Sequence, residues 1–391
     1  MVTRSRQHPA PMAYWRRRLA ATMADGGHNS GALARSLYGC SILYGRIVAA
    51  RVRRLRRNSG GIRRLPRPVI SVGNLTTGGT GKTPMTAYLA GLLRSWGLKP
   101  VILSRGYGGA GEKSGLVVSA GRGPQVPARV AGDEAYLLAQ RLPEVPVVVG
   151  RKRYAMGLTA MEAFAPDCFI LDDGYQHIQL HRDLNLALLD YRRPFGNGHL
   201  LPRGHLREPL AALGRADALV LTRCDLNAAV MPELEPWRGG KPLFRTAHRS
   251  VLTQRWVGGQ RTPLADPGQI PGEQGVFLFS GIADNAAFRE AAATLGGRPV
   301  GYLEYADHHP YSTGDMAAIE AAARVAGAGA LLTTAKDFVR LPQPLDAGLE
   351  VWVADADLVF DGDDFQAFIR RRLTALVAWP SGEMRPAARA R

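Results

Sequence analysis

The chain has 391 residues, more than one compact core usually holds, so we expect two domains. Hydrophobic residues make up 46% of it and charged residues 21%, a globular composition that excludes a disordered chain. The formal net charge of +17 favours a polyanionic partner, although arginine enrichment of a whole proteome is an alternative source of part of this charge. The three cysteines have no C-x-x-C spacing, which indicates a reduced protein without a cysteine-built metal site.

The N-terminal region is basic. Residues 1–30 are predicted to form a disordered extension, and no apolar stretch there resembles a signal peptide. Residues 33–50 predict a helix with a wide apolar face, far too short in its uncharged part to span a membrane, and an arginine-rich run follows. We therefore predict a membrane-associating segment over 31–67 that lies on an anionic surface, with a packing helix and a solvated basic linker as the alternative. No recognition motif favours nucleic acid as a partner.

The stretch PVISVGNLTTGGTGKTP (68–84) predicts a phosphate-binding P-loop between a strand and a helix. Glycines allow backbone N–H groups to converge on phosphate oxygens, and the helix N-terminus adds a positive dipole. Lys82 supplies a full charge, and the Thr83 hydroxyl can ligate Mg²⁺. Thr76 replaces the first glycine of the usual G-x-x-x-x-G-K-[ST] pattern. The predicted nucleotide-binding residues are Thr76, Thr77, Gly78, Gly79, Thr80, Gly81, Lys82 and Thr83.

Strands and helices alternate through the next part of the chain, which predicts a P-loop NTPase-like, doubly wound, mostly parallel α/β sheet over 68–240. Near-continuous apolar runs predict strands at 68–72, 99–104, 145–149, 167–172, 184–190 and 216–222. Helices are expected at 84–96, 132–142 and 153–164. Asp172 and Asp173 end the fourth strand in a Walker B arrangement that can hold Mg²⁺, with a simple turn or cap as the alternative.

A second, smaller α/β domain is predicted over 241–345, as a lid joined by a hinge. Residues 226–270 lose the alternating rhythm and suggest a linker or hinge. Further strands are expected at 275–282, 300–305 and 329–334, with helices at 284–295 and 315–326. The segment 346–380 is expected to return to the core with a strand at 349–360 and a closing helix at 363–379. A disordered tail over 381–391 follows.

Several charged residues have two readings from the sequence alone. Asp133 starts a helix, where an N-cap is the simpler role. The basic run Arg151, Lys152 and Arg153 has two interpretations: it binds a phosphate, or it begins a helix whose basic face is solvated. His308 and His309 can accept a proton, or belong to a surface loop. The stretch 222–225 is a weak match to the base-reading motif of GTPases, so the sequence leaves GTP open beside ATP.

Nine motifs in one order resemble the tetraacyldisaccharide 4′-kinase family, the lipid A kinases of Gram-negative bacteria. They are GNLTTGGTGKTP, SRGYGG, GDEAYLLA, VGRKRYA, ILDDGYQHIQLHRDLNLALLD, GHLLPRGHLREP, FSGIADNAAF, YADHHPYS and TTAKDFVRL. The resemblance covers about residues 33 to 375. It implies a monotopic protein on the cytoplasmic face of the inner membrane. It also implies transfer of the γ-phosphoryl group of ATP to the 4′-hydroxyl of an acylated glucosamine disaccharide 1-phosphate.

The same resemblance implies roles for particular residues. Asp133 becomes the catalytic carboxylate, with His308 as its partner, and Lys82 contacts the phosphates. The implied Mg²⁺ ligands are Thr83, Asp172 and Asp173, and the implied disaccharide-binding residues are Arg153, Gln176 and His177. TTAKD replaces the common TEKD, which leaves Lys336 and Asp337 without a role. The rival class is a membrane-recruited P-loop ATPase or GTPase switch, in which a second lysine stands where this chain has Thr77.

Overall fold

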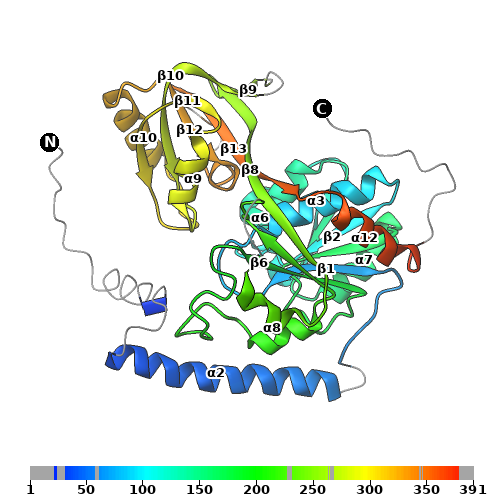
Figure 1. Cartoon of the computed structure of the whole chain (residues 1–391). Helices are drawn as coiled ribbons and strands as arrows, with labels where there is room; N and C mark the ends of the chain where they lie inside the picture. The colour runs from blue at the N-terminus through cyan, green and yellow to red at the C-terminus, as the bar shows by residue number, and fades with distance from the viewer. Residues whose placement is uncertain are drawn as a thin grey trace.

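The computed structural model describes residues 22–23, 31–57, 61–226, 231–262, 264, 268–342, 345 and 347–377. The predicted extension over 1–30, apart from two residues, and the predicted tail over 381–391 lie outside the described residues. Figure 1 shows two lobes of unequal size, with the long helix α2 lying along the outside of the larger one.

The larger lobe is built on six parallel strands, in the order β7-β6-β1-β5-β2-β4. These strands are β1 (Val69–Asn74), β2 (Pro100–Ser104), β4 (Pro146–Val149), β5 (Cys168–Asp172), β6 (Leu184–Asp190) and β7 (Ala218–Thr222). All six were predicted from their apolar runs, and the doubly wound fold class is confirmed. A short strand that the sequence did not indicate, β3 (Leu116–Ala120), closes the edge antiparallel to β4.

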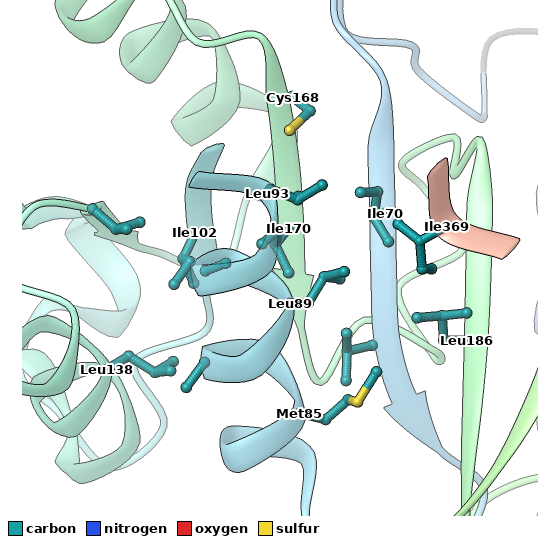
Figure 2. Packing of buried hydrophobic residues seen from close by; sticks show 14 of the residues in the cluster. Ile70, Met85, Leu89, Leu93, Ile102, Leu138, Cys168, Ile170, Leu186 and Ile369 are labelled. Atoms are coloured by element: carbon teal, nitrogen blue, oxygen red, sulfur yellow. The ribbon is translucent and has the colours of Figure 1, made fainter. Parts of the chain in front are cut away.

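Helices cover both faces of this sheet (Figure 1). The main ones are α3 (Lys82–Ser95), α6 (Asp133–Arg141), α7 (Arg153–Phe164) and α12 (Asp364–Thr374), with shorter turns α4 (Gly111–Ser114), α5 (Ala128–Ala131), η1 (Leu210–Arg215), η2 (Pro232–Leu234) and α8 (Glu235–Arg238). Figure 2 shows Met85, Leu89 and Leu93 of α3 packed on Ile70 and Ile170 of the sheet. This packing fixes the start of α3, and so the P-loop, against the carboxyl end of β1.

The smaller lobe has four parallel strands in the order β11-β10-β12-β13. They are β10 (Ile270–Ser280), β11 (Gly296–Glu304), β12 (Ala330–Thr334) and β13 (Glu350–Phe360), with helices α9 (Asn285–Ala292), α10 (Thr313–Val325) and α11 (Ala335–Phe338). A capping box of Ser312 and Asp315 starts α10. The carboxyl end of β11 leads to the loop that carries His308, and the carboxyl end of β12 leads to α11.

The expectation of an irregular linker over 226–270 is wrong for its central part. Residues Leu243–Val257 form the long strand β8, and β9 (Gln260–Thr262) folds back on it. β8 pairs with β7 at its start and antiparallel with β13 along most of its length, so one 13-stranded sheet runs through both lobes. The pattern was missed because several of its side chains are polar and only partly buried.

The helix α2 (Ala32–Arg57) is longer than predicted, because the arginine-rich run continues the helix instead of forming a linker. Ser41 Oγ donates to Leu200 O at 2.8 Å and Tyr44 Oη donates to Arg207 O at 3.0 Å, which docks one face of α2 on the core. The large apolar side chains exposed on α2 are Tyr38, Ile42, Leu43 and Ile47. Among the described residues, no helix has the length and apolar character needed to cross a bilayer.

Candidate active site

The P-loop joins β1 to α3, and its backbone requires glycine at two points. Gly78 has φ 108° and Gly81 has φ 75°, in the left-handed region that other residues rarely adopt. Lys82 is the first residue of α3, with only 8% of its surface exposed. The N–H groups of the first turn of a helix lack intrahelical partners, which makes this end of α3 suited to an anion. The Thr77 amide instead donates to His205 O at 2.8 Å, so Thr77 anchors the loop.

Asp172 is the buried member of the carboxylate pair at the end of β5. It accepts hydrogen bonds from Thr86 Oγ1 at 3.1 Å and from Ser104 Oγ at 3.0 Å, both neutral donors. Burial, and then the negative charges of Glu134 and Asp173, raise the pKa of Asp172. A cation placed near this carboxylate would favour its ionised form.

Asp173 is held by two cations and has the unusual φ of 47°. Arg207 Nη1 lies 3.0 Å from its Oδ2, and Lys82 Nζ lies 3.9 Å from its Oδ1. Burial disfavours the charged form, but the charges of Lys82 and Arg207 outweigh this and lower the pKa of Asp173. Arg207 also contacts Gln176 Oε1 at 3.3 Å, and Gln176 Nε2 donates to Asn74 O at 2.8 Å. Arg207 therefore connects a predicted metal-binding residue with a predicted substrate-binding residue.

Arg153 and His177 lie in a buried, positively charged part of the site. Arg153 is 4% exposed, and its Nε has no hydrogen-bond partner within the described part of the chain. Burial, with the neighbouring charge of Arg105, lowers the pKa of Arg153 to about 10. Burial, with the charges of Arg153 and Arg182, lowers the pKa of His177 to about 3, so the imidazole is neutral at pH 7. An anionic ligand would relieve this excess of positive charge.

Asp133 and His308 come together across the two lobes, although 175 positions separate them in sequence. His308 Nδ1 lies 3.4 Å from Asp133 Oδ2, and His308 has a φ of 62°. Burial alone would raise the pKa of Asp133, but its contacts with His308 and with the Arg340 guanidinium lower it. The contact with Asp133 raises the pKa of His308. Arg340, 2.6 Å from Asp133 Oδ2, is part of this group.

Sequence reasoning missed Arg207 and Arg340, although both lie in quoted motifs, GHLLPRGHLREP and TTAKDFVRL. Lys336, which had no assigned role, lies 3.4 Å from Glu134 Oε1 across the lobes. Three groups of residues thus converge at the carboxyl edge of the sheet: the P-loop with Lys82, the carboxylate pair after β5, and the Asp133 cluster. Together with the fold, these features define a P-loop phosphotransferase.

Comparison with known proteins identifies the family. Residues 33–374 match the family described as Tetraacyldisaccharide-1-P 4′-kinase. A tetraacyldisaccharide 4′-kinase of Desulfatibacillum aliphaticivorans is 38% identical over 93% of this chain and 99% of its own length. The same enzyme of Geobacter metallireducens is 45% identical over 75% of this chain and 85% of its own. A crystal structure of LpxK from Aquifex aeolicus in complex with ATP has a TM-score of 0.68 and 34% identity, covering 88% of this chain and all of that one.

The chain belongs to the tetraacyldisaccharide 4′-kinase family, and the resemblance seen in its motifs is confirmed. It is a phosphotransferase of lipid A biosynthesis that acts on the 4′-hydroxyl of a tetraacyldisaccharide 1-phosphate. These comparisons support the kinase over the rival class, a membrane-recruited P-loop switch.

Proposed function

We propose that this kinase takes its phosphoryl group from ATP with Mg²⁺ bound, at the P-loop on the side of the second lobe. The proposal is carried by Lys82 at the start of α3, which lies 3.9 Å from Asp173 in the carboxylate pair, together with the contact between Asp133 and His308 across the lobes. The complex of the Aquifex aeolicus relative with ATP supports this choice of nucleotide. Phosphoryl transfer needs positioning and charge neutralisation more than covalent catalysis, and these residues suit both tasks.

The residues after β5 and at the start of α3 fit a magnesium ion. No cluster of three His, Cys, Asp or Glu side chains able to hold a metal occurs among the described residues. Magnesium in kinases usually has only one or two carboxylate ligands, with phosphate and water completing the shell. Among the described residues, the hydrogen-bond donors to Asp172 are both hydroxyls, so this carboxylate fits the role, and Thr83 would complement it. Asp173 already pairs with Lys82 and Arg207, so we expect it to lie outside the set of direct ligands of the metal. Bound Mg²⁺ would neutralise charge on the phosphates.

Asp133 and His308 would handle the proton of the sugar hydroxyl. A carboxylate with a lowered pKa is ionised at neutral pH and can accept a hydrogen bond from the attacking 4′-hydroxyl. As the hydroxyl oxygen bonds to phosphorus, its proton would pass to Asp133 and from there to the neutral His308 ring, whose Nδ1 lies 3.4 Å from Asp133 Oδ2. Because His308 belongs to the second lobe, the pair is complete only when the two lobes meet, which would limit transfer to water.

The buried positive region of Arg153, His177 and Gln176 would bind the phosphorylated disaccharide. The buried Nε of Arg153 has no hydrogen-bond partner among the residues that the structure describes, and a planar guanidinium suits phosphate oxygens. The neutral His177 can donate to or accept from a sugar hydroxyl without adding charge. Gln176, held by Asn74 and Arg207, would keep its position while the ligand exchanges.

The helix α2 would hold the enzyme on the anionic cytoplasmic face of the inner membrane. It combines exposed apolar side chains with a C-terminal half rich in exposed arginines. Each basic residue at such a surface contributes about 1 kcal/mol. The double variant R53Q/R54Q should therefore bind anionic phosphatidylglycerol vesicles about thirtyfold more weakly. R298Q/R324Q, which removes two exposed arginines of the other lobe, is the matched control, and equal loss in both variants would refute this surface.

Transfer of labelled phosphate tests the proposal directly. The full chain is incubated in detergent micelles with Mg²⁺, γ-labelled ATP and tetraacyldisaccharide 1-phosphate, and the label should appear in the lipid. GTP at equal concentration should support a much lower rate. Labelled lipid without Mg²⁺, or equal rates with GTP, would contradict the assigned cofactors.

A further inference from the structure

Arg340 has the most specific set of contacts that the assigned roles leave unexplained. It follows α11 in the second lobe, and its side chain is only 7% exposed. Its Nε lies 2.6 Å from Asp133 Oδ2, and its Nη2 lies 3.0 Å from His308 Nδ1. One guanidinium thus contacts both members of the proposed proton-handling pair, and it does so from the lobe opposite to Asp133.

A buried carboxylate fixes Arg340 in this position. Asp337 is fully buried, and its Oδ1 lies 3.5 Å from Arg340 Nη1. The same carboxylate accepts from the Gly281 amide at 2.8 Å and from Tyr311 Oη at 3.1 Å. The Gly281 carbonyl accepts in turn from the His308 amide at 3.1 Å and from Arg340 Nη1 at 3.3 Å. Arg340 and the backbone of His308 are therefore held to one another through Gly281 and Asp337.

The contacts at His308 Nδ1 depend on its proton. A guanidinium only donates, so Nδ1 must lack a proton to accept from Arg340. A protonated Nδ1 would instead donate to Asp133, 3.4 Å away. The shorter Arg340 contact favours the neutral ring, with its proton on Nε2. Arginine stays charged at every accessible pH, so it can keep Asp133 ionised and His308 in this tautomer together.

We propose that Arg340 is a positioning residue, which orients the Asp133 carboxylate and the His308 ring for proton transfer when the lobes meet. The inference rests on the proposed role of Asp133. It also gives Asp337 a task, since this buried carboxylate holds the guanidinium against the pair. Lys336 is different: it lies on α11 with Asp337 and pairs with Glu134, but it makes no contact with Asp133 among the described residues.

The test compares four variants of the full chain. R340Q removes the charge, R340K keeps the charge without the planar fork, K336Q removes a neighbouring ion pair between the lobes, and R324Q removes an exposed arginine of α10. Measurements are kcat, the KM values for ATP and lipid, the pH dependence of kcat/KM, and the thermal midpoint. R340Q should lower kcat about a hundredfold, the cost of a misplaced reactive group, with the KM for ATP within twofold. R340K should recover part of kcat.

The pH profile separates positioning from simple support of the fold. Asp133 is faced by His308 and Arg340, with the Glu134–Lys336 pair beside it and Asp307 near His308. Because Arg340 lowers the pKa of Asp133, its loss should move the acid limb of kcat/KM to higher pH. K336Q and R324Q should leave this limb in place. The contact with Asp133 raises the pKa of His308 and the charge of Arg340 opposes this rise, so the His308 resonance should titrate at higher pH in R340Q. NMR spectra of histidine-labelled protein, with H308A used to assign the resonance, would measure this shift.

Two results would overturn the inference. One is an R340Q enzyme with wild-type kcat and an unmoved acid limb. The other is an identical loss in K336Q and R340Q, because that would reduce Arg340 to one of several contacts between the lobes. Asp133→Asn is the separate check on the proposed function: a near-normal rate there would remove the role of Asp133 itself, whatever R340Q does.

Discussion

Replacement of Gly81 by alanine tests the P-loop geometry most directly. Gly81 has φ 75°, and an alanine in this left-handed region costs about 1–2 kcal/mol. A β-carbon at this position would also lie 2.8 Å from Nε2 of His248, a half-buried ring on β8. No real β-carbon contact is this short, so the loop or the imidazole must move. Movement of the loop would shift Lys82, the next residue, which we place on the phosphates.

We therefore expect two measurable effects of G81A. The thermal midpoint should fall, by about 1 °C for each kcal/mol lost in a chain of 391 residues that unfolds as one unit. ATP affinity, measured by calorimetry, should also fall. If the nucleotide-bound protein is destabilised by at least about 1.4 kcal/mol more than the free protein, the affinity falls about tenfold or more. The double variant G81A/H248A removes the contact but keeps the backbone cost, so it should recover only part of either loss.

Gly91 supplies the matched control for this substitution. It lies on the exposed face of α3, and a β-carbon there would meet nothing within 4 Å. Alanine is the better helix former, so G91A should stabilise the protein by about 0.5–1 kcal/mol. The same chemical change thus has opposite signs at two positions ten residues apart in sequence. A neutral G81A, or equal effects at both glycines, would refute the argument.

Three further predictions follow from other parts of the structure. Burial and the charge of Arg223 lower the pKa of His248 to about 4. The contribution of this neutral ring to stability should therefore be complete above about pH 6.5 and be lost as the pH falls towards 4. In urea unfolding at several pH values, the unfolding free energy should depend less steeply on pH in H248Q. Arg141 pairs with Asp355 and Asp357 of β13, so R141Q should lower the unfolding free energy by about 1–3 kcal/mol, unlike R324Q. Asp133→Asn should abolish most transfer while ATP affinity stays within a few-fold, and loss of ATP binding would contradict its role.

The fold of the larger lobe could be predicted because its strands are buried on both faces of the sheet, which requires continuous apolar runs in the sequence. β5 and β6 are almost continuously apolar, and few other structures suit such runs. β8 gave no such signal, because it passes between the lobes with polar side chains on its open face. The helical arginine run of α2 was missed for a different reason: arginine is a good helix former, but a charged segment carries no apolar periodicity.

The site divides in the same way. Lys82, Thr83 and the carboxylates after β5 follow from local patterns, because each lies at a fixed place relative to its own strand. The pairing of Asp133 with His308 came from the family resemblance, since spacing alone cannot reveal a contact over 175 positions. Arg207 and Arg340 lie within motifs of the family, but neither had a local pattern that assigned it a role, because single arginines do not stand out in a chain with 50 lysines and arginines. Only their partners show which arginines belong to the site.

The strand that was hardest to predict also connects the two halves of the proposed reaction. β8 places His248 beside Gly81 of the P-loop, and further along it pairs with β13 in the smaller lobe. The smaller lobe in turn carries His308 and Arg340 to Asp133. β8 therefore joins the phosphate-binding loop of the larger lobe to the lobe that carries His308 and Arg340.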